Sequence, residues 1–411
     1  MDDPGAICID DYNYLLPEEL IAQFPLPDRD ASKLLVCRDG IFSQDVFSNI
    51  DQYLPGNSLL VFNDTRVIRA RLLFTRPSGA RVEVFCLEPA SPSTDFRTAL
   101  QQPSGPSWKC LVGNLKRWKE GDLVMDCSSV GLPCKLTATY EGLCGDGTHA
   151  VTFHWDPPER TFSEILEAAG RIPLPPYIHR PAEMTDNTRY QTIFAAPEGS
   201  VAAPTAGLHF TKGVLDRLAL RGILLNHVTL HVGIGTFKPV SAERIADHVM
   251  HHEKIIVTRQ LTEWLLNNPG RPLFAVGTTS ARTLESLYWL GVQLLNEPGS
   301  RHPSVSQWDP YRENGLQQPA TEKSLAALLR FMDDHGMDEY AGETQLMIVP
   351  GYRFRLISGL VTNFHMPKST LLLLVAAMIG DDWKRAYDYA GSNGFRFLSY
   401  GDSCLFFKQA E

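Results

Sequence analysis

The sequence predicts an α/β main domain that carries a small, inserted all-β domain with a barrel-like form. Three observations lead to this fold class. Apolar runs of strand length are followed by polar turns and then by helical patterns over much of the chain. One stretch, residues 67–155, holds only short β-like runs. The length of 411 residues suits two or three domains. We therefore expect a discontinuous α/β domain over residues 1–66 and 156–411, with the β domain inserted at 67–155.

The main domain repeats one local pattern, in which a strand-like apolar run precedes a turn rich in Gly, Thr, Ser, Asn or Pro. The runs and their turns are 58–62 before 63–66, 200–203 before 204–207, 225–232 before 233–236, 273–276 before 277–280, and 356–361 before 362–365. Helical patterns begin near Thr211, after the 277–280 turn and after Ser369. Ligands of α/β sheets bind beyond the carboxyl ends of the strands, which is where these polar turns fall.

The stretch 67–155 follows a different pattern, because helical periodicity is hard to find in it. Its β-like runs are 81–87, 108–112, 122–126, 134–140 and 149–155. Gly, Pro and Ser separate these runs, as is typical of a small barrel. A second irregular segment, residues 296–322, is rich in Pro, Ser, Gln and Asn and predicts a long loop.

Composition limits the class of protein. With 44% hydrophobic and 21% charged residues, the chain is not globally disordered. The net charge of -9 argues weakly against non-specific nucleic-acid binding, although basic clusters such as 116–119 allow a local polyanion surface. The eight cysteines form no C-x-x-C pair, the N-terminus lacks a signal peptide, and the longest apolar run, 371–379, is too short for a membrane span. We expect a cytoplasmic monomer with mostly free thiols and no membrane partner.

Two turns in the sequence can bind an anion. Gly277-Thr278-Thr279-Ser280 opens a helix, so its hydroxyl groups can cap that helix or leave its N–H groups for a ligand. Lys368-Ser369-Thr370 offers the same choice with an added positive charge. It is not a nucleoside-triphosphate loop, because the pattern G-x-x-x-x-G-K-[ST] is missing.

Histidines concentrate in the middle of the chain. His209 and His231 lie at putative strand ends, which makes them candidates for acid–base chemistry, whereas His227 fits a structural role. A second group consists of His248, His251, His252 and Glu253. This group is similar to a metal-ligand cluster, but H-E-x-x-H and its cysteine counterpart are absent. We therefore favour polar or base-contacting histidines and expect no metal.

Several longer runs occur in one collinear order along nearly the whole chain. They are 16–23 with Arg29 and 32–36, 63–68, 175–178 with Arg180 and 189–191, 199–210, 230–233 with 235–237, 276–280 with Arg282, 362–365 with 367–370, and 399–403. Together they resemble the S-adenosylmethionine:tRNA ribosyltransferase-isomerase family of queuosine biosynthesis, and the run GSVAAPTAGLHF at 199–210 is the most specific. The chain departs from the family pattern at Arg69, at His252 and Lys254, and in a longer loop between about 296 and 340.

The resemblance implies an enzyme that consumes S-adenosylmethionine as a co-substrate and uses no separate cofactor. The implied acceptor is 7-aminomethyl-7-deazaguanine at the wobble position of a tRNA anticodon, and the products are epoxyqueuosine-tRNA, adenine and methionine. The positive sulfur acidifies the ribose C5′ protons, so a base can form an ylide as adenine leaves. The acceptor amine then attacks the sugar, and epoxide closure expels methionine. Such a protein must supply a base, an acid and shielding from water.

The matching runs also supply the candidate site. The expected catalytic residues are His209, His231, Asp64 and Glu253. The expected substrate-binding residues are Arg66, Tyr190, Thr205, Gly233, Gly235, Thr236, Thr278, Thr279, Ser280, Arg282, Asn363, His365 and Lys368. Within this set, the hydroxyl turn at 278–280 suits a carboxylate or phosphate, and the two arginines suit anionic groups.

Three alternatives remain open on the sequence. A tRNA-binding relative without catalysis would bind tRNA but release no adenine. A metal-dependent hydrolase would use the His248, His251, His252 and Glu253 cluster. An ordinary methyltransferase would need a Gly-rich first strand–helix turn, which is missing near the N-terminus.

Overall fold

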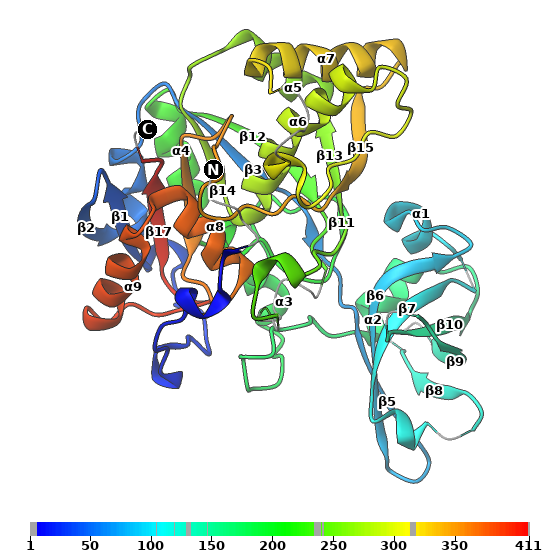
Figure 1. The fold of residues 1–411 in the computed structure, drawn as a ribbon. Coiled ribbons are helices and arrows are strands. Elements are labelled where there is room, and N and C mark those ends of the chain that lie inside the picture. Colours follow the sequence, from blue (N-terminus) through cyan, green and yellow to red (C-terminus); the bar gives the residue numbers. More distant parts are fainter. Residues whose placement is uncertain are drawn as a thin grey trace.

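The computed structural model describes residues 6–409 except 104, 119, 129–132, 146, 234–239, 241 and 313–317. The chain forms a main body around a large mixed sheet and a smaller β module at one end of it (Figure 1). The strands of the large sheet, in spatial order, are β15 (Glu339–Thr344), β13 (Glu253–Thr258), β12 (Leu224–Leu230), β3 (Leu59–Asn63), β14 (Leu273–Val276), β16 (Gly359–Asn363), β17 (Ser403–Phe407), β1 (Lys33–Arg38) and β2 (Ile41–Val46).

The centre of this sheet is parallel, and its margins are antiparallel. Strands β12, β3, β14 and β16 run parallel to one another. Strands β13 and β15 add antiparallel pairs at one edge, and β17 reverses direction on the other side of β16. The central strands β3 and β14 are buried at every residue, in keeping with their continuous apolar runs. Antiparallel edge strands beside the parallel core were not evident in the sequence.

Helices cover both faces of the sheet. One face packs against α5 (Arg259–Asn267), α6 (Thr278–Asn296), α7 (Thr321–Asp334), α8 (Thr370–Ile379) and α9 (Asp382–Ser392). The other face packs against the 3-10 helices η5 (Phe47–Gln52) and η7 (Thr205–His209) and against α4 (Lys212–Leu220). Alternate strand residues serve the two cores: Val61 and Leu360 face the first, whereas Leu60 and Val361 face the second. Helix α6 is buried along almost its whole length.

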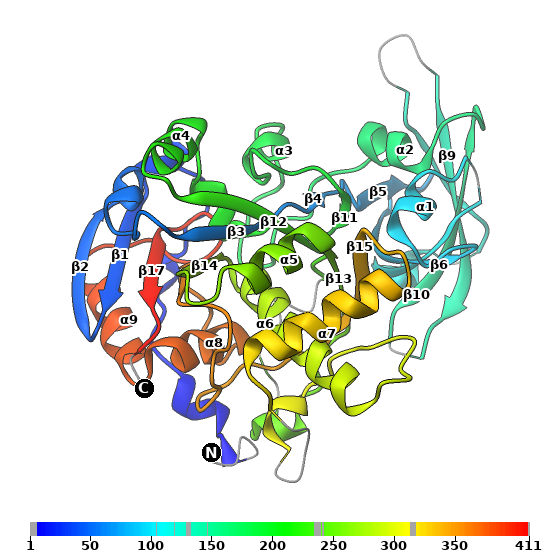
Figure 2. The same cartoon turned by 90° about the horizontal axis from the view of Figure 1, so that it is seen from above.

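The β module is a nearly closed antiparallel sheet. Its strands, in spatial order, are β5 (Arg71–Thr75), β6 (Arg81–Ser91), β7 (Ser107–Gly113), β10 (His149–Asp156), β9 (Lys135–Leu143) and β8 (Leu123–Asp126). The outer strands β5 and β8 contact each other, which gives the predicted barrel-like form. Figure 2 shows the module beside the β13–β15 end of the main body. The α/β fold with an inserted all-β domain is thus confirmed.

The core of the module extends past residue 155. Helices α1 (Phe96–Leu100) and α2 (Phe162–Ala169) bury Phe96, Phe162 and Leu166 in the same core as the barrel strands. An isolated bridge joins Arg71 to Arg171, so the two ends of the module lie side by side. The predicted limits, 1–66 with 156–411 and 67–155, stay a prediction, and this packing favours an upper limit after α2.

Short elements complete the chain. They are β4 (Arg66–Val67), β11 (Glu198–Ser200), α3 (Asp186–Arg189), η2 (Ile9–Tyr12), η3 (Glu18–Leu20), η4 (Arg29–Ala31), η6 (Leu115–Arg117), η9 (Ile245–Asp247) and η10 (Asp309–Tyr311). The predicted strand over 200–203 is wrong, because β11 ends at Ser200, whose hydroxyl donates to the Ala202 carbonyl at 2.7 Å and turns the backbone. In the described part of the chain, no helix has the length and apolar content that a bilayer crossing requires.

Most cysteines have free thiols, as expected, but two form a disulfide. Six cysteines are free, and four of these are buried. Cys127 and Cys134 form a disulfide that joins the end of β8 to the start of β9, a pairing that the spacing did not predict.

Candidate functional site

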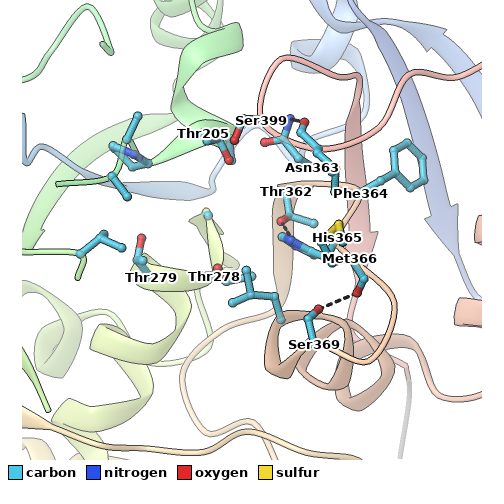
Figure 3. Close-up of a pocket in the computed structure, with 18 of the residues that line it drawn as sticks. Thr205, Thr278, Thr279, Thr362, Asn363, Phe364, His365, Met366, Ser369 and Ser399 are labelled. Carbon is cyan, nitrogen blue, oxygen red and sulfur yellow. Dashed lines mark hydrogen bonds between the residues drawn. The ribbon is translucent and has the colours of Figure 1, made fainter. Parts of the chain in front are cut away.

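A pocket lies at the carboxyl edge of the central strands, as the position of the polar turns predicted. Thr278 and Thr279 enter it after β14, Asn363 enters it at the end of β16, and Thr205 enters it from η7. Ser399 closes one side. Figure 3 shows these side chains around the pocket, with Thr205, Ser399 and Asn363 grouped together and the two α6 threonines facing them.

The start of α6 forms a wall of this pocket. Gly277, at φ 92°, makes the turn from β14 into the helix, and its N–H donates to the Val361 carbonyl at 2.8 Å. No side chain in the described part of the chain caps α6, although Thr278 and Thr279 both line the pocket. By contrast, the Ser369 hydroxyl caps α8 by accepting from the Leu372 N–H at 3.2 Å. The free N–H groups and the dipole of α6 therefore suit an anionic ligand group.

His209 lies behind the pocket wall and has partners for both ring nitrogens. Its Nδ1 is 2.8 Å from the Ser32 hydroxyl, and its Nε2 is 3.0 Å from the Asn363 amide nitrogen. Burial lowers the pKa of His209 to about 3, so the ring is neutral at physiological pH. His209 does not line this pocket but contacts Asn363, which does.

Two further polar pairs shape the pocket. His365 shares a hydrogen bond of 2.8 Å between its Nε2 and the Thr362 hydroxyl, and burial lowers its pKa to about 3 (Figure 3). The Tyr177 and Ser399 hydroxyls are 2.7 Å apart. All four residues line the pocket, so its walls offer neutral polar atoms rather than charged groups.

His231 lies in a separate cleft between the main body and the β module. Its Nδ1 is 3.0 Å from the Thr65 hydroxyl, and its ring packs on Phe96 of the module at 5.2 Å between centroids. Burial lowers its pKa to about 4. Lys254 also lines the cleft and donates to the Thr94 carbonyl at 2.6 Å. The neighbouring Val232 lines both the cleft and the pocket, so the two cavities share this residue as part of their walls.

The other two expected catalytic carboxylates lie away from the pocket. Glu253 forms a buried ion pair with Arg282, which joins β13 to α6, and the burial of Arg282 lowers its pKa to about 10. Asp64 accepts from the Thr229 hydroxyl at 2.7 Å, and burial raises the pKa of its carboxyl. In the structure, Glu253 and Arg282 are therefore paired with each other.

The remaining expected binding residues divide by position. Thr205, Thr278, Thr279, Asn363 and His365 line the pocket, and Gly233 lines the cleft. The other four contact protein groups instead. Arg66 is exposed beside Glu167 and Glu198, and Lys368 pairs with Asp10. Tyr190 is buried against Tyr400, and the Ser280 hydroxyl donates to the Val276 carbonyl. Gly235 and Thr236 lie outside the described residues.

Two pocket residues, Tyr177 and Ser399, were not among the expected site residues, although the sequence runs that contain them pointed to the family. Tyr177 and Ser399 belong to runs that carry the family resemblance, 175–178 and 399–403. Within the basic run 116–119, Trp118 is buried and donates to the Gly121 carbonyl at 3.0 Å. Lys119 lies outside the described residues.

The histidine cluster at 248–253 does not assemble. Glu253 is paired with Arg282, and His252 lies 3.3 Å from Glu343. Among the described residues, no three His, Cys, Asp or Glu side chains are grouped to hold a metal ion. The geometry thus lends no support to a metal-dependent hydrolase.

Comparison with known proteins identifies the family. The family model described as queuosine biosynthesis protein matches residues 9–406. The chain belongs to this family. It is 38% identical over 401 residues to the S-adenosylmethionine:tRNA ribosyltransferase-isomerase of Pelobacter propionicus, covering 96% of this chain and 98% of that one. It is 39% identical over 407 residues to the enzyme of the same name from Geobacter sulfurreducens, covering 97% and 99%.

One solved structure is also similar, the S-adenosylmethionine tRNA ribosyltransferase of Thermotoga maritima. It is 28% identical, with 96% of this chain and 99% of that chain covered and a TM-score of 0.45. The family expected from the collinear runs is confirmed by the match to the family model.

Proposed function

We propose that this family member transfers and isomerises the ribosyl group of S-adenosylmethionine onto 7-aminomethyl-7-deazaguanine in tRNA, with release of adenine and methionine. The relatives are named for this activity, and the chain matches them over almost their whole length, which supports the enzyme class. The observation that carries the proposal is that Val232 lines two cavities, the pocket with its neutral polar walls and the cleft between two bodies. A reaction that joins a small donor to a base on a large RNA needs both.

The pocket is the proposed donor site. The methionine carboxylate is placed at the uncapped start of α6, where N–H groups and the helix dipole stabilise negative charge. The neutral hydroxyls of Thr205 and Ser399 are placed near the ribose and adenine.

The cleft is the proposed acceptor site, and His231 is the proposed acid–base residue within it. Its Nδ1 is held by Thr65, and its Nε2 has no partner among the residues described. In its neutral form, Nε2 takes a proton from the ribose C5′. The C5′ carbon then bonds to C1′ as the C1′–N9 bond breaks, and adenine leaves with that proton. The acceptor amine bonds to C1′ as the C1′–O4′ bond breaks, and the amine loses a proton to solvent. The freed O4′ bonds to C5′ to close the epoxide as the C5′–S bond breaks, which releases methionine.

We further propose that the enzyme acts as a cytoplasmic monomer with tRNA as its macromolecular partner and no cofactor beyond the consumed S-adenosylmethionine. Neither a non-catalytic tRNA-binding role nor hydrolase chemistry gains support from the site geometry or the relatives.

The test is adenine release from S-adenosylmethionine with purified protein and tRNA that carries 7-aminomethyl-7-deazaguanine. The expected result is release that requires this base, with a matching mass gain on the tRNA. The control is the same tRNA with unmodified guanine at the wobble position, which should give no release. Folded protein that binds the modified tRNA and releases no adenine would refute the proposed function.

A further inference from the structure

The side-chain amide of Asn363 has a fixed orientation on the pocket wall. Its Nδ2 lies 3.0 Å from His209 Nε2, 3.3 Å from the Leu398 carbonyl and 3.4 Å from the Asp402 carbonyl. Carbonyl oxygens only accept hydrogen bonds, so both require the nitrogen, and not the oxygen, of the amide on their side. The amide oxygen must therefore point the other way.

That oxygen is the unusual atom of the pocket. Asn363 is 2% exposed, and its Oδ1 has no hydrogen-bond partner among the described residues. Buried polar atoms in folded proteins almost always have a partner. Asn363 also lines the pocket beside Ser399 (Figure 3). An acceptor that is buried, unpaired and on a pocket wall indicates a ligand group that donates a hydrogen bond.

His209 is built to hold this amide. Since Nδ2 donates to Nε2, the ring proton must be on Nδ1, where the Ser32 hydroxyl lies at 2.8 Å. Phe47 packs on the ring at 5.1 Å between centroids. Both ring nitrogens are thus committed, and neither lines the donor pocket, so His209 has no nitrogen with which to exchange a substrate proton.

We propose that His209 is a positioning residue that holds Asn363 so that its Oδ1 accepts a hydrogen bond from an O–H or N–H group of the sulfonium donor. This inference rests on the proposed function, because it takes S-adenosylmethionine as the occupant. The acceptor-only contact admits a ribose hydroxyl or an amino group and excludes the carboxylate, which fits the opposite wall at α6. His209 therefore acts on binding, and the acid–base step belongs to another group.

Two His209 variants separate positioning from proton transfer. His209→Gln keeps an acceptor near the place of Nε2 but cannot titrate, whereas His209→Leu fills the space and offers no acceptor. At saturating tRNA, we expect His209→Gln to stay within about threefold of the parent in kcat and in KM for S-adenosylmethionine. We expect His209→Leu to raise that KM about tenfold with little change in kcat, since one hydrogen bond to the amide is lost. Asn363→Ala should raise KM by about tenfold or more.

Controls keep the comparison clear. His227→Gln replaces another partly buried histidine, which packs on Phe62 and Phe194 away from the pocket, and should leave both constants unchanged. If His209→Leu does not fold, Ser32→Ala serves instead, because it frees the ring by removing the partner of Nδ1 and should raise KM in the same direction. A kcat loss of 100-fold or more in His209→Gln, or unchanged KM in both His209→Leu and Asn363→Ala, would overturn the proposal.

A second measurement does not depend on turnover. Protein labelled with ¹⁵N-histidine should show His209, assigned by its loss in His209→Gln, as a neutral ring with the proton on Nδ1 from pH 5.5 to 8. A charged ring or the Nε2–H form in this range would refute the positioning role. Wild-type protein that shows the expected ring state but releases no adenine would instead count against the proposed function alone.

Discussion

His209 and His231 occupy two regions of the molecule that look alike in sequence and differ in structure. In the sequence both lie at expected strand ends, and in the structure burial lowers the pKa of both rings. The ring of His209 lies inside one body with both nitrogens bonded. The ring of His231 lies between two bodies with only Nδ1 bonded. The difference shows that the unpaired nitrogen, rather than burial or a shifted pKa, separates a candidate acid–base histidine from a structural one.

Replacement of His231 tests this contrast with the largest expected effect. His231→Gln should lower kcat for adenine release by about 10²–10⁴-fold, the range for loss of a general acid–base group, while His209→Gln keeps its rate. Because the pKa of His231 is lowered to about 4, its neutral form persists above that pH, and the parent's rate should show no histidine inflection between about pH 5.5 and 8. Rate and pH profile are measured at saturating tRNA. Equal losses in both variants would remove the distinction.

The next largest expected effect is on stability, from breaking the ion pair between Glu253 and Arg282. Glu253→Ala leaves the buried Arg282 without its partner and should lower the free energy of unfolding by about 3–5 kcal/mol. The double variant Glu253→Met with Arg282→Leu should recover most of this loss, because no unpaired charge remains. Denaturant unfolding measures both. A single variant that stays stable but loses turnover would return Glu253 to the catalytic group.

Gly199 tests how tightly the cleft histidine is held. At φ +150°, Gly199 packs so closely on His231 that an added Cβ would lie 2.7 Å from its Cε1. Gly199→Ala should therefore displace the ring, lower stability by about 1–3 kcal/mol and reduce kcat. The matched control is Gly79→Ala, at φ +79° with no atom within 4 Å of an added Cβ, which keeps the backbone strain and removes the clash. Equal kcat values for the two variants would contradict the tight packing.

The smallest expected effect is on the free energy of unfolding at acidic pH. Three neutral buried histidines, His209, His231 and His365, have pKa values lowered to about 3, 4 and 3. Their stabilisation is fully present above the unfolded pKa near 6.5 and is lost as pH falls toward the folded values, by about 1.4 kcal/mol per pH unit for each group. Unfolding at pH 6 and pH 5 should therefore give a smaller pH slope in His209→Gln than in the parent. An identical slope would mean that His209 is charged in the fold.

The sequence supported much of the fold and of the pocket for a physical reason. Buried parallel strands need continuous apolar runs, so β3, β12 and β14 were predicted nearly at their bounds, and the pocket followed from the turns after them. At one margin, β13 alternates buried and half-buried residues, the edge strand β15 buries only Tyr340 and Thr344, and the pairing of both strands depends on partners far along the chain. Such pairing leaves little trace in local periodicity.

Roles within the site were harder to predict than its location. Thr278, Asn363 and His365 line the pocket as expected, because they follow strands that end there. Glu253 and Arg282 were expected to act on substrate, but they are bonded to each other across two elements. No local pattern in a sequence shows which partner a buried charge has found. The same limit applies to His209. Its hydrogen-bond partners, Ser32 and Asn363, are separated from it by 177 and 154 positions along the chain.

The bridge between Arg71 and Arg171 has a consequence for the history of the chain. Since the module leaves and rejoins the main body at one point, a single insertion event could have introduced it without cutting the large sheet. Its removal would require only a short replacement turn at that bridge. Such a truncated protein would keep the donor pocket but lose Phe96, the aromatic cover of His231. The module thus also forms one side of the cleft that holds His231.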